Sequence, residues 1–166
     1  GEVAVDTETN SLDPHQADLV GVSLCSKIGK ACYIPIGHKS SKCIDKNIVI
    51  KKLKPLLEDP SVKKIGQNIK FDFIVLYKQG ITISSMEDTM LMSYVLDAGK
   101  NRHNMDTLSE IHLGHKTISF KEIVGTGKKE INFSDVEIDK AKDYAAEDAD
   151  ITFRLYKKLI KNLKSE

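Results

Sequence analysis

The sequence lacks any apolar run long enough to span a lipid bilayer, and its N-terminus lacks a basic segment followed by an apolar stretch. We therefore expect no transmembrane helix and no secretory signal peptide. Its three cysteines, Cys25, Cys32 and Cys43, are odd in number and show no C-x-x-C spacing. This pattern predicts buried or free thiols in a reducing cytoplasm.

A large excess of one charge is also missing, since the formal net charge is +1. This value excludes the strong global basicity of a non-specific DNA coat protein. It leaves room for a nucleic-acid enzyme, because an acidic metal site can offset a local basic surface. The length of 166 residues predicts one domain, residues 1–166. A strand begins almost at residue 1, so we expect this domain to belong to a longer chain.

Apolar patterning predicts strands first and an alternation of helices and strands after them. Residues 2–5 form a short apolar run, and the runs at 18–26 and 30–37 are typical of a hairpin. Helical spacing before Pro60 is followed by a strand at 63–68, a helix at 69–80, a strand at 81–88 and a helix at 89–99. This order predicts a three-layer α/β domain around a mixed sheet.

The remaining third of the chain is less regular until its last element. Residues 100–134 contain one helical piece, 105–114, and a loop-like segment that includes GTGKKEINFS. An amphipathic helix is predicted from about residue 139 to residue 163.

Two carboxylates stand where the first strand ends. Asp6 and Glu8 are two residues apart, so on an extended backbone their side chains point to the same face. The segment after them is rich in turn residues, and a polar strand end is an equally good explanation of this pair alone.

The last helix places one aspartate on its apolar stripe. A 3.6-residue period puts seven residues on one face: Ala141, Tyr144, Ala145, Asp148, Ile151, Leu155 and Leu159. Burial of the Asp148 carboxylate is costly unless it is paired or bound to a metal. Glu147 and Asp150 lie on the charged side, where Asp150 and Arg154 form an i, i+4 pair, so we interpret both as solvated charges.

A fourth carboxylate, Asp72, lies in the otherwise apolar stretch QNIKFDFIVL. Four carboxylates in one dry site repel one another unless hard divalent cations bind them. Two such ions, roughly 3.5–4 Å apart, form the usual clamp for displacement at phosphorus. We therefore predict a two-metal site at the carboxyl-terminal edge of the sheet, built from Asp6, Glu8, Asp72 and Asp148.

The segments VDTETN, GQNIKFD and YAAEDAD resemble the three motifs of the DEDD 3′–5′ exonucleases, in the variant with a tyrosine in the third motif. An ordered series that includes LVGVSL, YIPIGH, DTMLMSYVLDAG and HKTISFKEIVGTGKK is similar to the proofreading exonuclease domain of bacterial DNA polymerase I, over essentially the whole chain. The resemblance implies a ribonuclease H-like fold with a mixed five-stranded sheet. It also implies removal of nucleoside monophosphates from a single-stranded DNA 3′ end during replication and repair.

The resemblance further implies roles for individual residues. Asp6, Glu8 and Asp148 would hold the metal that activates water, and Asp6 and Asp72 would hold the second metal. The metals would be Mg²⁺ or Mn²⁺, with Zn²⁺ as an alternative at one site. Tyr144 would orient the water. The implied substrate contacts are Leu12, Gln67, Asn68, Phe71, Arg102 and Phe120.

Two further expectations concern partners and alternatives. The implied partners are a single-stranded DNA 3′ end and the polymerase domain of the same chain, in a monomeric protein that lies at the nucleoid in the cytoplasm. A ribonuclease D-like RNA exonuclease, which shares the catalytic motifs, is one alternative. A non-catalytic single-strand-binding scaffold is the other, and its mark would be lost carboxylates, which this sequence does not show.

Overall fold

The computed structural model of the chain describes residues 1–39 and 42–165. Ser40, Ser41 and Glu166 belong to the predicted domain 1–166 but lie outside the described residues. Within the described part, no helix has both the length and the apolar character that crossing a membrane requires.

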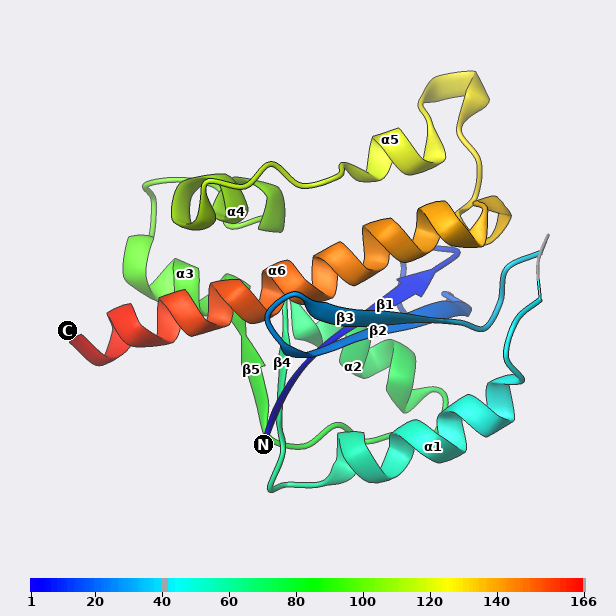
Figure 1. Cartoon of the computed structure of the whole chain (residues 1–166), viewed down its shortest axis with the longest axis horizontal. Helices are drawn as coiled ribbons and strands as arrows, with labels where there is room; N and C mark the ends of the chain where they lie inside the picture. Colours follow the sequence, from blue (N-terminus) through cyan, green and yellow to red (C-terminus); the bar gives the residue numbers. More distant parts are fainter. Residues whose placement is uncertain (40–41, 166) are drawn as a thin grey trace.

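A five-stranded mixed sheet with the order β3-β2-β1-β4-β5 forms the centre of the protein (Figure 1). The strands are β1 (Glu2–Thr9), β2 (Leu19–Lys27), β3 (Lys30–Pro35), β4 (Lys63–Gly66) and β5 (Met86–Asp88). β1, β2 and β3 pair antiparallel, which confirms the predicted hairpin. β4 pairs parallel to β1, and β5 parallel to β4. The predicted mixed five-stranded sheet is therefore confirmed.

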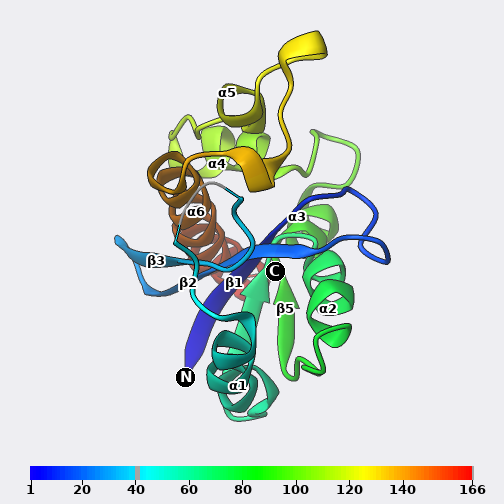
Figure 2. The ribbon, with the colours of Figure 1, turned by 90° about the vertical axis from the view of Figure 1, so that its right-hand side faces the viewer.

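Helices cover both faces of this sheet, as Figures 1 and 2 show. The helices are α1 (Lys46–Glu58), α2 (Ile69–Tyr77), α3 (Thr89–Asp97), α4 (Met105–Leu113), α5 (Phe120–Val124) and α6 (Ile138–Ser165). One core joins β1 residues such as Val5 to α1 and α2 through Leu57 and Leu76. A second core joins Ala4 of β1 to Leu155 of α6. Successive residues of β1 thus enter opposite cores, as the two-residue period of a strand requires.

The start of α2 is fixed by an aspartate from a different element. Asp88, at the end of β5, accepts hydrogen bonds from the backbone N–H groups of Asn68 and Ile69, at 3.0 and 3.1 Å. These are N–H groups at a helix start, which have no partner inside the helix. Asn68 itself has a left-handed backbone, with φ of 57°. The contact from β5 sets where α2 begins and hence where Asp72 lies.

Helix α5 lies in the region predicted to be irregular. Ser119 caps it, because its hydroxyl accepts from the N–H of Glu122 while the Glu122 carboxylate accepts from the N–H of Ser119. This reciprocal arrangement is a capping box. The sequence carries its pattern, S-x-x-E, at residues 119–122. The absence of α5 from the prediction was therefore an error that local sequence could have corrected. Two short 3₁₀ turns, η1 (Gly127–Lys129) and η2 (Phe133–Asp135), lead from α5 to α6.

Candidate active site

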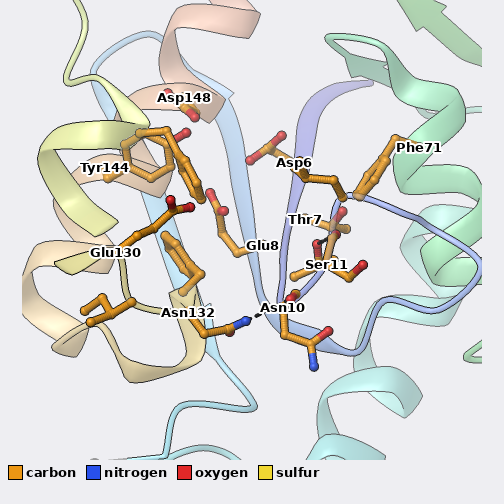
Figure 3. A pocket seen from close by; sticks show the side chains of 15 residues that line it. Asp6, Thr7, Glu8, Asn10, Ser11, Phe71, Glu130, Asn132, Tyr144 and Asp148 are labelled. Carbon is orange, nitrogen blue, oxygen red and sulfur yellow. Dashed lines mark hydrogen bonds between the residues drawn. The ribbon is translucent and has the colours of Figure 1, made fainter. Parts of the chain in front are cut away.

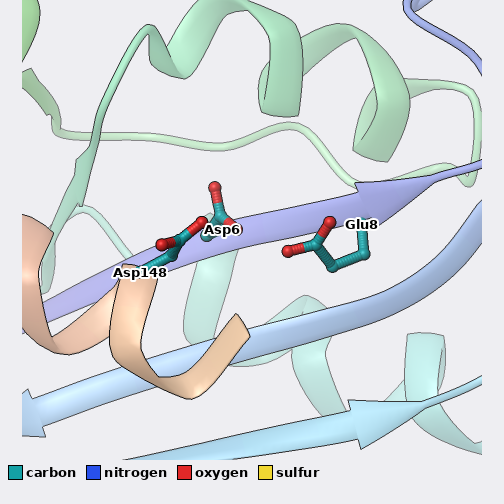
Figure 4. A group of neighbouring side chains, drawn as sticks. All are labelled: Asp6, Glu8 and Asp148. Atoms are coloured by element: carbon teal, nitrogen blue, oxygen red, sulfur yellow. The ribbon is translucent and has the colours of Figure 1, made fainter. Parts of the chain in front are cut away.

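Three carboxylates from two elements meet on the α6 face of the sheet. Asp6 and Glu8 point from β1, and Asp148 points toward them from α6 (Figure 4). One oxygen atom of each lies within 4.8 Å of an oxygen of the other two. The i, i+2 spacing therefore places the first two carboxylates on one face, as predicted.

The apolar stripe of α6 directs the Asp148 side chain toward the protein interior. Every predicted member of the stripe except Tyr144 is buried, and Tyr144 is partly buried. Asp148 itself is 5% exposed. The periodicity of the helix thus carries a carboxylate into contact with the end of β1, where an uncompensated charge is costly.

The electrostatics of this cluster favour neutral carboxyl groups in the absence of a cation. Desolvation, and then the negative charge of Asp148, raises the pKa of Asp6 well above its ordinary value. Desolvation, followed by the charges of Asp6 and Asp148, does the same to the pKa of Glu8. Desolvation also raises the pKa of Asp148 well above its ordinary value. A divalent cation would compensate these charges with the oxygen ligands it prefers.

Asp72 reaches the same strand from the opposite face of the sheet. Its Oδ1 accepts from the backbone N–H of Thr7 at 2.8 Å and from the Thr7 hydroxyl at 2.6 Å. It is 3% exposed. Desolvation, and then the charge of Asp6, raises its pKa well above the ordinary value. Asp72 is thus electrostatically linked to Asp6, although it is outside the close three-carboxylate group.

Tyr144 lies one helical turn before Asp148 on α6. Desolvation, and then the charge of Asp148, raises the pKa of the Tyr144 phenol far above its ordinary value. The centroid of its ring lies 6.0 Å from the ring centroids of Phe120 and Phe133. Those two phenyl rings stack on each other, with centroids 6.2 Å apart. These three rings form an aromatic wall beside the carboxylates.

A cleft of about 320 Å³ opens over the three carboxylates, and Figure 3 shows its lining. Of the predicted substrate contacts, Leu12, Phe71 and Phe120 line it. Leu12 is 91% exposed, so it projects from the loop after β1 without packing against the protein. Phe120 is 41% exposed, which leaves part of its ring free for contact.

The other predicted contacts lie outside this lining. Gln67 donates from Nε2 to the carbonyl oxygen of His103 at 2.7 Å, and its Oε1 accepts from Thr89. Asn68 belongs to a separate hollow at the start of α2. Its Oδ1 is buried and has no hydrogen-bond partner among the described residues. Arg102 is exposed in the loop before α4. The structure thus gathers half of the predicted contact set at the cleft.

Sequence reasoning missed several residues that line or support the cleft, among them Thr7, Glu130 and Asn132. Thr7 holds Asp72, and it stands between the two predicted carboxylates on the opposite face of β1. Glu130 and Asn132 line the cleft from the loop before α6. Alternation along β1 could have drawn attention to Thr7, whereas no periodic signal marks the other two.

The interpretation of Glu147 and Asp150 as solvated, paired charges is confirmed for the pairing of Asp150 with Arg154, but both residues are only partly exposed. Glu147 hydrogen-bonds to His115 Nε2 at 2.8 Å and accepts from the N–H of Ile118 at 2.7 Å. Asp150 accepts from the N–H of Gly29, in the β2–β3 turn, at 2.6 Å. Its expected ion pair with Arg154 is present at 2.7 Å. Both carboxylates therefore attach distant loops to α6, which helical periodicity cannot reveal.

The mixed sheet with helices on both faces has the architecture of the ribonuclease H-like exonucleases. In fold it is similar to Escherichia coli RNase D, with a TM-score of 0.72 at 18% identity, over 99% of this chain and 40% of that one. It is also similar to Brucella melitensis NrnC bound to pGG, with a TM-score of 0.75 at 26% identity, over 99% of this chain and 74% of that one. The predicted fold class is confirmed.

Within this class, the family model described as 3′-5′ exonuclease matches residues 1–164, and the chain belongs to that family. It is 46% identical to DNA polymerase I of Rhizobium leguminosarum, over 94% of this chain, and 45% identical to DNA polymerase I of Pseudomonas aeruginosa, over 98%. It spans only 17% and 18% of the length of these relatives. The predicted resemblance to the exonuclease domain of bacterial DNA polymerase I is confirmed.

Proposed function

We propose that this chain is a metal-dependent 3′–5′ exonuclease that removes nucleoside monophosphates from single-stranded or frayed DNA 3′ ends, and so proofreads DNA during replication and repair. The observation that supports this most directly is the group of Asp6, Glu8 and Asp148 at an open cleft. Membership of the 3′-5′ exonuclease family supports the direction of attack.

The donor set suits two divalent cations, Mg²⁺ or Mn²⁺. Asp6, Glu8 and Asp148 would hold one, and Asp6 and Asp72 the other, all through carboxylate oxygens, which hard cations prefer. Bound cations would supply Lewis acidity and lower the pKa of an attacking water. Raised carboxyl pKa values fit such a site, because groups that bind cations often repel one another without them.

Tyr144 would orient the attacking water. Its raised pKa keeps the phenol protonated at neutral pH, so its O–H acts as a hydrogen-bond donor and not as a base. The packing of its ring against Phe120 and Phe133 restricts its position. A fixed donor beside the carboxylates favours one direction of attack.

The rim of the cleft would bind the strand. Leu12 would act as a wedge near the terminal base, and Phe120 and Phe71 would contact bases, since aromatic faces stack on any base. Gln67, Asn68 and Arg102, which lie outside the lining of the cleft, would contact the last nucleotides of the strand. Arg102 is exposed, and the forked geometry of a guanidinium suits a phosphate.

The partner beyond DNA would be the polymerase part of one longer chain. The relatives' greater length and their names support this proposal. We place such a monomeric polymerase in the bacterial cytoplasm at the nucleoid, where its template lies.

The test uses 5′-labelled single-stranded DNA and a matched RNA, each incubated with Mg²⁺, Mn²⁺ or EDTA. We expect a ladder that shortens from the 3′ end of the DNA, requires metal and disappears in Asp148→Ala. Asp139→Ala is the matched control, because Asp139 lies on the same helix with its side chain 95% exposed. Faster loss of RNA would favour the ribonuclease D-like alternative, and binding without cleavage would favour the scaffold.

A further inference from the structure

Ser23 is a buried serine whose hydroxyl has no partner. It is 0% exposed, and its Oγ makes no hydrogen bond within the part of the chain that the structure describes. Two other buried serines differ from it, since Ser93 Oγ pairs with His103 Nδ1 at 2.9 Å and Ser109 Oγ donates to the carbonyl oxygen of His115 at 2.8 Å. Buried polar groups are nearly always paired, so an isolated hydroxyl calls for a reason.

The register of the sheet places Ser23 beside the carboxylate cluster. Ser23 in β2 lies directly opposite Asp6 in β1. Side chains opposite each other in antiparallel strands point to the same face, with Cβ atoms about 4.5–5.5 Å apart. The Ser23 side chain therefore shares the α6 face with Asp6, and rotation about its Cα–Cβ bond can turn Oγ toward the carboxylate.

The neighbours of Ser23 are engaged elsewhere. Asp6 faces the carboxylates of Glu8 and Asp148, with an oxygen within 4.8 Å of an oxygen of each. On the other side Ser23 lies opposite Tyr33, but the Tyr33 ring leans over Gly21 and its hydroxyl bonds to His38 Nε2 at 2.6 Å. Since His38 Nδ1 faces the carbonyl oxygen of Val136, it must donate there, and Nε2 accepts from Tyr33. The Tyr33 hydroxyl thus has a partner of its own.

We propose that Ser23 is a positioning residue whose hydroxyl donates to the Asp6 carboxylate when that carboxylate holds a divalent cation. A bound cation would hold Asp6 in its charged form through a carboxylate oxygen. Ligating carboxylates are commonly hydrogen-bonded by outer residues, and Ser23, directly opposite Asp6 with an unpaired hydroxyl, is placed to be such a residue. This inference rests on the proposed metal-dependent function, and it assigns β2 a part in a site built from β1 and α6.

The experiment measures Mn²⁺ binding, which needs no catalysis, by the loss of the electron paramagnetic resonance signal of the free ion. Ser23→Ala should lower Mn²⁺ affinity about 10-fold, the lower end of the effect of outer residues at metal sites. Its thermal midpoint in EDTA should be unchanged or higher, because no hydrogen bond is lost. Ser109→Ala is the matched control and should lower the midpoint while Mn²⁺ affinity stays the same. Ser23→Thr, which keeps the hydroxyl, should bind Mn²⁺ more tightly than Ser23→Ala.

The outcomes separate the inference from the function on which it rests. Mn²⁺ binding by the parent chain with equal binding by Ser23→Ala would overturn the role of Ser23 and leave the exonuclease proposal intact. A Ser23→Thr chain that folds but binds as weakly as Ser23→Ala would also overturn it. If the parent chain binds no Mn²⁺, the metal site itself is wrong, and the role of Ser23 is overturned with it.

Discussion

Asn132 Nδ2 donates a hydrogen bond to the backbone carbonyl oxygen of Asn10 at 2.8 Å, and so joins the two walls of the cleft (Figure 3). Asn10 belongs to the loop that carries Leu12, and both polar atoms of its side-chain amide pair with Asp18. Asn132 Oδ1 accepts from the N–H and the hydroxyl of Ser134, at 3.0 and 2.8 Å. The loop that carries Leu12 is therefore tied at its base and across the cleft.

Removal of the hydrogen bond from Asn132 to Asn10 should weaken the binding of single-stranded DNA. Asn132→Ser keeps a side-chain oxygen that can cap Ser134, since serine is a good capping residue, but it is too short to reach Asn10. We expect the KM for single-stranded DNA to rise about five-fold, the equivalent of one hydrogen bond worth about 1 kcal/mol. Ser134→Ala, which removes one capping bond and leaves the tie, should keep the parent KM. Steady-state kinetics with both variants measures the difference, and equal KM values would contradict it.

Metal-free stability should depend on pH through Asp148. Because desolvation raises the pKa of Asp148 in the folded state, protonation favours folding. This contribution is complete below the unfolded pKa of about 3.9 and is lost as the pH rises through the folded value. In EDTA at alkaline pH, Asp148→Asn should therefore be more stable than the parent chain, by on the order of 1–3 kcal/mol.

Thermal unfolding across pH checks this prediction. The difference between the two chains should shrink toward zero in acid, where Asp148 is neutral in both states. Saturating Mn²⁺ should make the parent chain more stable than Asp148→Asn, because metal binding stabilises the folded parent chain more. Asp143→Asn is the control, since its side chain is 68% exposed and lies outside the cluster. A parent chain that is the more stable one in EDTA at alkaline pH would rule out a raised pKa of Asp148 in the folded state.

Tyr144→Phe should slow the chemical step and leave metal binding unchanged. The ring keeps its packing against Phe120 and Phe133, whereas the donor beside Asp148 is lost. A loss of about 10- to 100-fold in single-turnover rate is expected from poorer orientation of the attacking water. Tyr94→Phe provides the control, because Tyr94 is 59% exposed and packs against His103, away from the carboxylates. Unchanged cleavage by Tyr144→Phe would remove the orienting role.

Asp150→Asn should distinguish the role of Asp150 from that of Asp148, the other aspartate of the third motif. The introduced amide keeps an oxygen for the N–H of Gly29 but loses the charge that pairs with Arg154. We expect a small loss of stability, about 1 kcal/mol or less, because that pair is partly exposed. Cleavage should stay within about two-fold of the parent rate, well under the loss of one hydrogen bond. An inactive Asp150→Asn that still folds would mean that the wrong aspartate is assigned to the cluster.

Periodic elements made much of this site predictable from sequence. The stripe of α6 marked Asp148, and the alternation of β1 marked Asp6 and Glu8, because a single helix or strand sets both patterns. The tie from Asn132 to Asn10 spans 122 positions and depends on how the loop before α6 folds back. The same limit applies to Asp150 and Gly29, 121 positions apart. Such contacts arise from tertiary structure, which local patterns do not encode.

The alternation of β1 has a consequence for folding. Asp6 faces α6, and Thr7, the next residue, holds Asp72 on the opposite side. A slip of one position in strand pairing would exchange these sides and separate the carboxylates. Cation affinity therefore reports whether the central strand has reached its native alignment. Recovery of Mn²⁺ binding after dilution from denaturant would time that alignment, independently of the return of helical content.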